Sequence, residues 1–165
     1  MKIRNLALVL LSLASISIKS FAFENKEINS FKTLNDFKTV EEFEKYYQSY
    51  TKECLDNGFG GTGSIPCFVS YELWDKELNS YYKKLISKLD AKEKESLKKS
   101  QRKWIESRDL SIDFNSNVLD KVYTEEGTMY MLMRAGDADS LIFPIIKERA
   151  LTLKRWYEIK TTEDN

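Results

Sequence analysis

The chain has 165 residues, with 26 basic side chains, 26 acidic side chains, two cysteines and no histidine. This length is enough for one domain with a substantial core. The lack of histidine excludes Ser-His and Cys-His nucleophile systems and most zinc sites, whereas a lysine-based mechanism stays open. The balanced charge gives no indication of a nucleic-acid partner. We therefore expect a protein that binds a partner without a cofactor rather than an enzyme.

The first 22 residues are typical of a secretory signal peptide. Two basic residues precede an apolar stretch over residues 6–18, and Ser20-Phe21-Ala22 has small residues at both positions of a cleavage site. The apolar stretch is shorter than the ~20 residues of a membrane-spanning helix, so an uncleaved anchor is the less favoured alternative. We predict cleavage near Ala22 and a periplasmic or secreted protein without a membrane span. Cleavage removes three basic residues and no acidic one, which leaves 23 against 26.

Residues 23–38 mix polar and aromatic side chains without a clear period, which predicts a loose leader. Thr39 and Glu42 then have the spacing of a capping box and predict a helix that continues towards Cys54. In an oxidising compartment, Cys54 and Cys67 form a disulfide.

The segment between the two cysteines contains four glycines in six residues, which is incompatible with a helix. Gly58, Gly60 and Gly63 match a dinucleotide-binding loop by spacing, but the required βαβ context is missing, so we reject that interpretation. Ser64 is predicted to cap the next helix, with Pro66 in its first turn.

That second helix is expected to end near Leu89. Asp90 and Glu93 then form a capping box for a third helix that runs to about Ile112 or beyond. The apolar stripes of these two helices predict an antiparallel hairpin, because facing positions in a hairpin have a constant sum. The predicted facing pairs are Leu85 with Leu97, Tyr81 with Gln101, Leu78 with Trp104, and Trp74 with Arg108.

The last third of the chain predicts a short helix over residues 129–135, a break at residues 136–139, and a final helix from about Ser140 to Ile159, bent near Pro144. The predicted fold class is all-α: an antiparallel helical hairpin with flanking helices and one disulfide. The predicted organisation is a signal peptide (1–22), a loose leader (23–38), a helical domain (39–160) and a flexible tail (161–165).

Glu72 and Asp75 lie one turn apart on the second helix. Paired carboxylates could act in acid–base chemistry or bind a metal, but a third suitable carboxylate is available only at Asp109. A polar network that fixes the hairpin register is favoured instead, with Asn79, Arg108 and Gln101 as the other members. The many aromatic residues have helical spacing, which favours core packing over a stacking platform.

Charge is unevenly distributed along the chain. Residues 83–103, at the predicted hairpin tip, carry nine basic and three acidic side chains, whereas residues 54–82 carry one basic and four acidic side chains. The hairpin tip is therefore predicted to be basic and the disulfide-loop end acidic, although a solvated helix face with incidental bias is an equal alternative.

Residues 54–149 resemble the LprI-like lysozyme-inhibitor family in a series of ordered positions. The two cysteines enclose a glycine-containing loop, and a Gly-Thr pair and a late Arg-x-Leu follow the two helices, at Gly127, Thr128, Arg149 and Leu151. The helix signatures are Glu72, Trp74, Asp75, Leu78, Asn79 and Tyr82 on the second helix, and Leu97, Gln101, Trp104, Ile105, Arg108 and Asp109 on the third.

The resemblance implies an exported helical domain, and its founding member is a lipoprotein that inhibits lysozyme. This chain has no lipidation cysteine, so it should be free in the periplasm, and Ser111 and Ile112 stand where many relatives carry a further cysteine. The expected function is binding, with inhibition of lysozyme or a related peptidoglycan hydrolase. The alternatives are an immunity or envelope-stress partner of another secreted toxin, and a structural module that binds anionic envelope material.

The disulfide loop is the predicted partner-binding element, with Phe59 and Asp56 as candidate contacts. A tethered loop loses less entropy on binding than a free one, and Phe59 stands among glycines that offer it little to pack against. An equal alternative is that Phe59 folds back onto the helices as part of the core.

Overall fold

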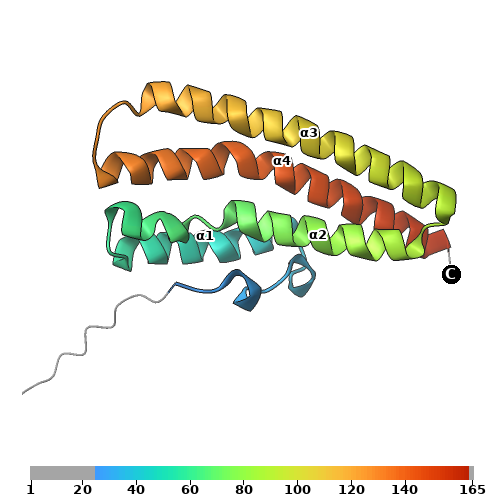
Figure 1. Ribbon diagram of the computed structural model, residues 1–165. Coiled ribbons are helices and arrows are strands. Elements are labelled where there is room, and N and C mark those ends of the chain that lie inside the picture. The colour runs from blue at the N-terminus through green and yellow to red at the C-terminus, as the bar shows by residue number, and fades with distance from the viewer. Residues whose placement is uncertain (1–24, 164–165) are drawn as a thin grey trace, which may run out of the picture.

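The computed structural model describes residues 25–163 (Figure 1). Within this range every regular element is helical: the chain contains four α-helices, three short 3-10 helices and no strand. The predicted all-α class with one disulfide is confirmed. The predicted signal peptide and its cleavage site lie outside the described residues. No helix in the described part is both long and apolar enough to cross a membrane.

The described part of the predicted leader, residues 25–38, is packed onto the bundle, so the expectation of a loose segment is wrong. It forms two 3-10 helices, η1 (Ile28–Ser30) and η2 (Leu34–Asp36). Phe31 and Leu34 are buried, and the backbone N–H of Leu34 donates to the Glu77 carboxylate at 3.1 Å. The segment has no helical period because it covers the core with individual side chains instead of a helix face.

Helix α1 (Val40–Asn57) begins as predicted, with the Thr39 hydroxyl accepting from the N–H of Glu42 at 3.1 Å. The carboxylate of Glu42 accepts from the N–H of Lys38 rather than from Thr39. The second cysteine ends a 3-10 helix, η3 (Gly61–Cys67), and α2 (Ser70–Lys88) starts three residues later. Ser64 is therefore not a helix cap. It is buried inside the loop, where its hydroxyl accepts from the N–H of Gly60 at 2.9 Å.

A tight turn joins α2 to α3 (Ala91–Val122), which extends ten residues beyond the predicted minimum. The predicted capping box is present: the Asp90 carboxylate accepts from the N–H of Glu93, and the Glu93 carboxylate accepts from the N–H of Asp90. Both bonds are formed within a single turn of chain, which explains why the local sequence was sufficient to predict this boundary.

The C-terminal third forms one helix, α4 (Thr128–Glu163), so the predicted break at residues 136–139 is wrong and the expected tail is helical as far as residue 163. Gly136 lies against the Phe68 ring, where an added Cβ would come within 2.8 Å of the ring. The glycine therefore allows close helix–ring packing without ending the helix. Pro144 is also accommodated, because burial of Ile146 and Leu153 on the same helix outweighs a lost backbone bond.

Helix α4 lies between α2 and α3 along most of the bundle (Figure 1). It packs mainly against α2 and less extensively against α3, while α2 and α3 make few contacts with each other. The two predicted hairpin helices are antiparallel and joined by a turn, but the predicted face-to-face register is wrong. Leu85 and Leu97, the pair nearest the turn, line one cavity. Trp74 faces Lys147 of α4, instead of Arg108.

The core is concentrated where α1, α2 and α4 meet. Its largest fully buried side chains are Trp74, Tyr47 and Phe43. Phe43 packs edge-on against both of the other rings, at centroid distances of 5.3 and 5.4 Å. The long helix α3 contributes few buried residues: Leu97, Gln101 and Leu119. One side of α3 therefore remains available for other contacts.

Candidate functional site: a disulfide-closed loop at the acidic end

The loop between α1 and α2 is closed by the Cys54–Cys67 disulfide, as predicted. Both cysteines are buried, so the bond ties the loop to the core and not merely to itself. An added Cβ at Gly58 would come within 2.6 Å of the Cys54 carbonyl oxygen and 2.8 Å of the Ser64 hydroxyl oxygen. The first turn of the loop thus packs too closely to accept any other side chain at Gly58.

The loop is also fixed to the first residue of α4. Gly61 has a φ of +51°, and its hypothetical Cβ would lie 2.6 Å from the hydroxyl oxygen of Thr128. Gly60 adopts a positive φ of 73° as well, so two successive residues require glycine. The glycine-rich loop is therefore a defined, docked structure.

Phe59 projects from this docked loop and is 81% exposed. The structure therefore does not place it among the core aromatic residues. Asp56, the other candidate contact, lies in the last turn of α1 and pairs with Lys52 one turn earlier. The pair is exposed, so its contribution to stability is small. Of the two candidates, Phe59 has the geometry of an apolar anchor.

Acidic side chains surround this end of the bundle. Residues 104–139, which form the later part of α3, the connection to α4 and its first turns, carry eight acidic and three basic side chains. Arg134 pairs with Asp120 at 2.6 Å, and the Tyr123 hydroxyl donates to Asp137 at 2.5 Å. A hydrogen bond to Glu125 raises the pKa of Tyr130. We call this region, together with the loop, the acidic end.

An exposed apolar stripe on α3 adjoins the acidic end and was not anticipated from the sequence. Leu110, Phe114 and Val122 are 70%, 67% and 64% exposed, and Val118 lies between the last two in the same row. Apolar residues at a spacing of four normally form the buried face of a helix. The spacing alone therefore identifies this stripe in the sequence. In the structure these four side chains are exposed and do not pack into the core.

Three apolar family-signature residues, Trp74, Leu78 and Leu97, are buried in the core. Trp74 donates from its indole nitrogen to the Tyr47 hydroxyl at 3.1 Å, and Leu78 is buried on the same face of α2. Tyr82 packs at the edge of this core. These positions hold the helices together and are not available to a partner.

The polar signature residues have partners other than those predicted. The Asn79 side chain donates to Asp75 on its own helix, and Arg108 pairs with its neighbour Asp109 at 2.6 Å. Gln101 accepts from Arg149 of α4 at 2.9 Å. The predicted network across the hairpin is thus replaced by contacts within each helix and by contacts to α4, because α4 separates the two helices.

Glu72 lines a shallow cavity together with Asp139 of α4. The Asp139 carboxylate accepts from the N–H of Tyr71 at 2.9 Å, which satisfies a free donor at the start of α2. Burial raises the pKa of Asp139, and the bond from Tyr71 partly offsets the shift. The described residues include no cluster of three or more potential metal ligands. The Asp139 carboxylate therefore caps the start of α2.

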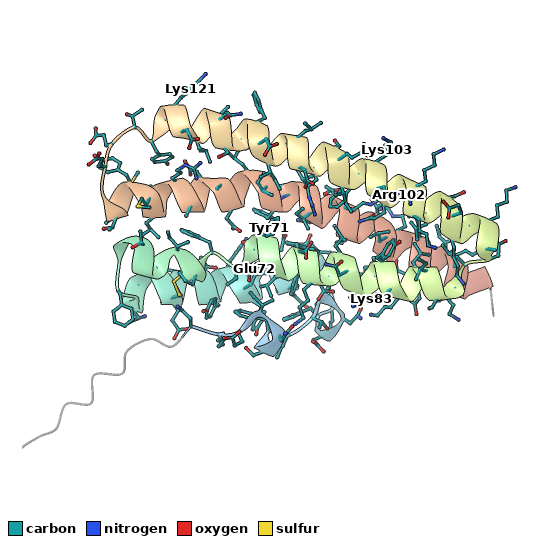
Figure 2. The ribbon with its side chains drawn as sticks, in the orientation of Figure 1. Tyr71, Glu72, Lys83, Arg102, Lys103 and Lys121 are labelled. Atoms are coloured by element: carbon teal, nitrogen blue, oxygen red, sulfur yellow. A yellow bond between two sulfur atoms is a disulfide. The ribbon has the colours of Figure 1, made fainter. Side chains whose placement is uncertain are left out.

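The opposite end of the bundle is basic, as the charge pattern predicted. The α2–α3 turn and the C-terminal turns of α4 meet there (Figure 1). Figure 2 shows Lys83 on α2 and Arg102 and Lys103 on α3, all in the half of the bundle that contains this turn. Residues 83–103 carry nine basic and three acidic side chains, and α4 brings further cations to them. We call this region the basic end.

The fold and these surfaces define the class: a small all-α bundle with one disulfide, an acidic end that carries an exposed loop, and a basic end. The family model for the lysozyme inhibitor LprI matches residues 67–141. Over this segment, which runs from the second cysteine into α4 and spans less than half of the sequence, the chain is similar to that family. Neither the curated proteins nor the solved structures compared with the chain give a match.

Proposed function

We propose that this protein is exported and inhibits lysozyme or a related peptidoglycan hydrolase by binding it, without catalysis, through the acidic end. The family match supports the inhibitor role and a protein partner. The observation that carries the choice of surface is the 81% exposure of Phe59 on a loop that is fixed at both ends.

A rigid exposed aromatic residue is the kind of side chain that dominates binding energy at protein interfaces. Anchors of this type fill a pocket on the partner, and truncating one commonly costs 2 kcal/mol or more. The disulfide and the contact between Gly61 and Thr128 hold the loop in place before binding. The entropy lost on association is therefore reduced.

Electrostatics favour a cationic partner at the same end. Lysozymes are typically cationic, and the eight acidic side chains of residues 104–139 outnumber three basic ones. Complementary charge accelerates encounter and orients the partner, while the basic end repels it. Met129, which follows Thr128 at the loop contact, is also exposed and adds an adaptable apolar surface.

The test is an inhibition assay with Phe59→Ala against lysozyme. Loss of an anchor worth about 2 kcal/mol corresponds to roughly 30-fold weaker inhibition. The free energy of unfolding should change little, because Phe59 is exposed. Ile159→Ala, a truncation of an exposed apolar residue at the basic end, is the matched control and should leave inhibition intact. A loss of stability that parallels the loss of inhibition would instead assign Phe59 to the folded core.

Wild-type protein that leaves lysozyme activity unchanged at high micromolar concentration would remove the lysozyme proposal. The immunity-partner alternative would then take its place, and a pull-down from envelope extract would identify the toxin. Export is tested separately by N-terminal sequencing of the protein from the periplasmic fraction. A sequence that begins near Phe23 is expected, and one that begins at Met1 would contradict export with cleavage.

A further inference from the structure

A cavity of about 570 Å³ opens at the basic end, where the last turns of α2 and α4 meet the first turns of α3. Buried Leu85 and Leu97 line it, together with Leu89 and the more exposed Trp156 and Ile159. Its size lies within the range of small-molecule sites, which are mostly apolar with a few polar groups that orient the ligand.

The polar residues that line the cavity are Lys92, Glu93, Ser96, Ser100 and Lys160, and the Glu93 carboxylate is paired with Lys160 at 2.8 Å. The guanidinium of Arg149 does not itself line the cavity but contacts two residues that do. It donates to the hydroxyl of Ser100, a lining residue, at 3.2 Å, and to Gln101 at 2.9 Å. The guanidinium carbon lies 5.7 Å from the Trp104 ring and 5.4 Å from the ring of Trp156, another lining residue. The cation is therefore held between two aromatic faces at the edge of an apolar cavity.

Arg149 has no carboxylate partner among the residues that the structure describes; both of its hydrogen-bond acceptors are neutral. Burial lowers the pKa of Arg149, and no nearby acid opposes the shift. Contacts with aromatic rings offset only part of the cost of burying a cation. The guanidinium has five N–H donors, so it retains donors for an anionic acceptor.

We propose that this cavity binds a single-chain amphiphile with a carboxylate head group, the carboxylate at Arg149 and the chain along Leu85, Leu89 and Ile159. A single guanidinium matches the two oxygens of one carboxylate, and the cavity has the size of a drug-sized ligand and not of a two-chain lipid. The basic surface around the opening attracts anions. This activity is separate from hydrolase inhibition, which we place at the other end of the molecule.

Titration of the full mature protein with dodecanoate below its micellar concentration tests the proposal, with calorimetry and tryptophan fluorescence as readouts. One dodecanoate should bind per chain and alter the fluorescence, since Trp156 lines the cavity. Dodecanol should bind roughly tenfold or more weakly, because it lacks the charge that Arg149 recognises. Equal affinity for dodecanol would overturn the role of Arg149, and equal affinity for dodecyl phosphate would overturn the choice of a carboxylate.

Two substitutions and one control variant locate the site. Ile159→Glu places a like charge on the cavity wall at a half-exposed position that tolerates a polar side chain, and should weaken dodecanoate binding roughly tenfold or more. Val122→Glu, an exposed position at the other end, is the matched control and should bind as wild type does. Arg149→Lys retains the charge but loses the planar fork, and should bind more weakly than wild type. Unchanged binding by Ile159→Glu would overturn the proposal even if the Arg149 variant fails to fold.

Discussion

Gly61 lies so close to Thr128 that a Cβ on the glycine would come within 2.6 Å of the threonine hydroxyl oxygen. This contact joins the disulfide loop to the first residue of α4, across a separation of 67 positions in the chain. Because Gly61 also has a φ of +51°, the joint depends on glycine for two independent reasons.

Gly61→Ala should destabilise the protein, by roughly 1–2 kcal/mol for the backbone alone and by more from the contact with Thr128. Denaturant unfolding measures the change. In a Thr128→Gly background the same substitution should cost less, since the contact is absent and the two changes are coupled. Gly63→Ala, in the same loop without a positive φ, should cost less than Gly61→Ala, because its Cβ would meet only the Phe59 Cβ, at 3.2 Å. Equal costs for Gly61→Ala in both backgrounds would contradict the contact.

Removal of the disulfide should cost about 3 kcal/mol, because the two cysteines are 13 residues apart and the bond restricts the unfolded chain. The measurement compares the unfolding free energy of wild type with that of a Cys54→Ala, Cys67→Ala double variant. Thiol labelling of denatured, non-reduced wild-type protein provides the control and should detect no free thiol. Two labelled thiols in the exported protein would show that the bond does not form there.

Tyr47→Phe should cost about 1–3 kcal/mol, because it leaves the buried indole N–H of Trp74 without its acceptor at 3.1 Å. The neighbouring Tyr46 accepts only a long, exposed bond of 3.4 Å from the N–H of Lys32. Tyr46→Phe is therefore the matched control, with an expected change within about 0.5 kcal/mol. Similar costs for both variants would mean that the Trp74–Tyr47 bond does not contribute to stability as we describe.

Glu77 and Glu93 should have opposite effects on the pH dependence of stability. Burial raises the pKa of Glu77 above its ordinary value, and the bond from the N–H of Leu34 only partly offsets the shift. The folded state therefore binds the proton more tightly than the unfolded state, and stability falls as pH rises from the ordinary pKa of 4.5 through the raised value. For Glu93, the bonds from Lys160 and from the N–H of Asp90 lower the pKa, so its contribution is lost as pH falls below 4.5.

The measurement is the unfolding free energy of Glu77→Gln and Glu93→Gln relative to wild type between about pH 3 and pH 8. As pH rises, wild type should lose stability relative to Glu77→Gln and gain it relative to Glu93→Gln. Slopes of the same sign would contradict the environment that we assign to one of the two carboxylates.

The sequence by itself determined the features that depend on interactions within a turn or two of chain. Thr39 and the Asp90–Glu93 pair marked two helix starts, because capping bonds form between residues three positions apart. The cysteine pair predicted the disulfide, and the charge pattern predicted the acidic and basic ends. The family resemblance rested partly on core residues such as Trp74, Leu78 and Leu97, and partly on polar positions that the structure leaves at the surface.

The tertiary structure decided everything that depends on which helix lies beside which. A glycine such as Gly136 looks the same in the sequence whether it ends a helix or makes room for a packed ring. Here the ring is that of Phe68, 68 positions earlier in the chain. The α3 stripe through Phe114 has the spacing of a buried face but is exposed, since apolar periodicity does not encode what covers it. Arg149 shows the same principle: Trp156 is on the same helix, but the contact of Arg149 with Trp104 exists only because α4 packs against α3.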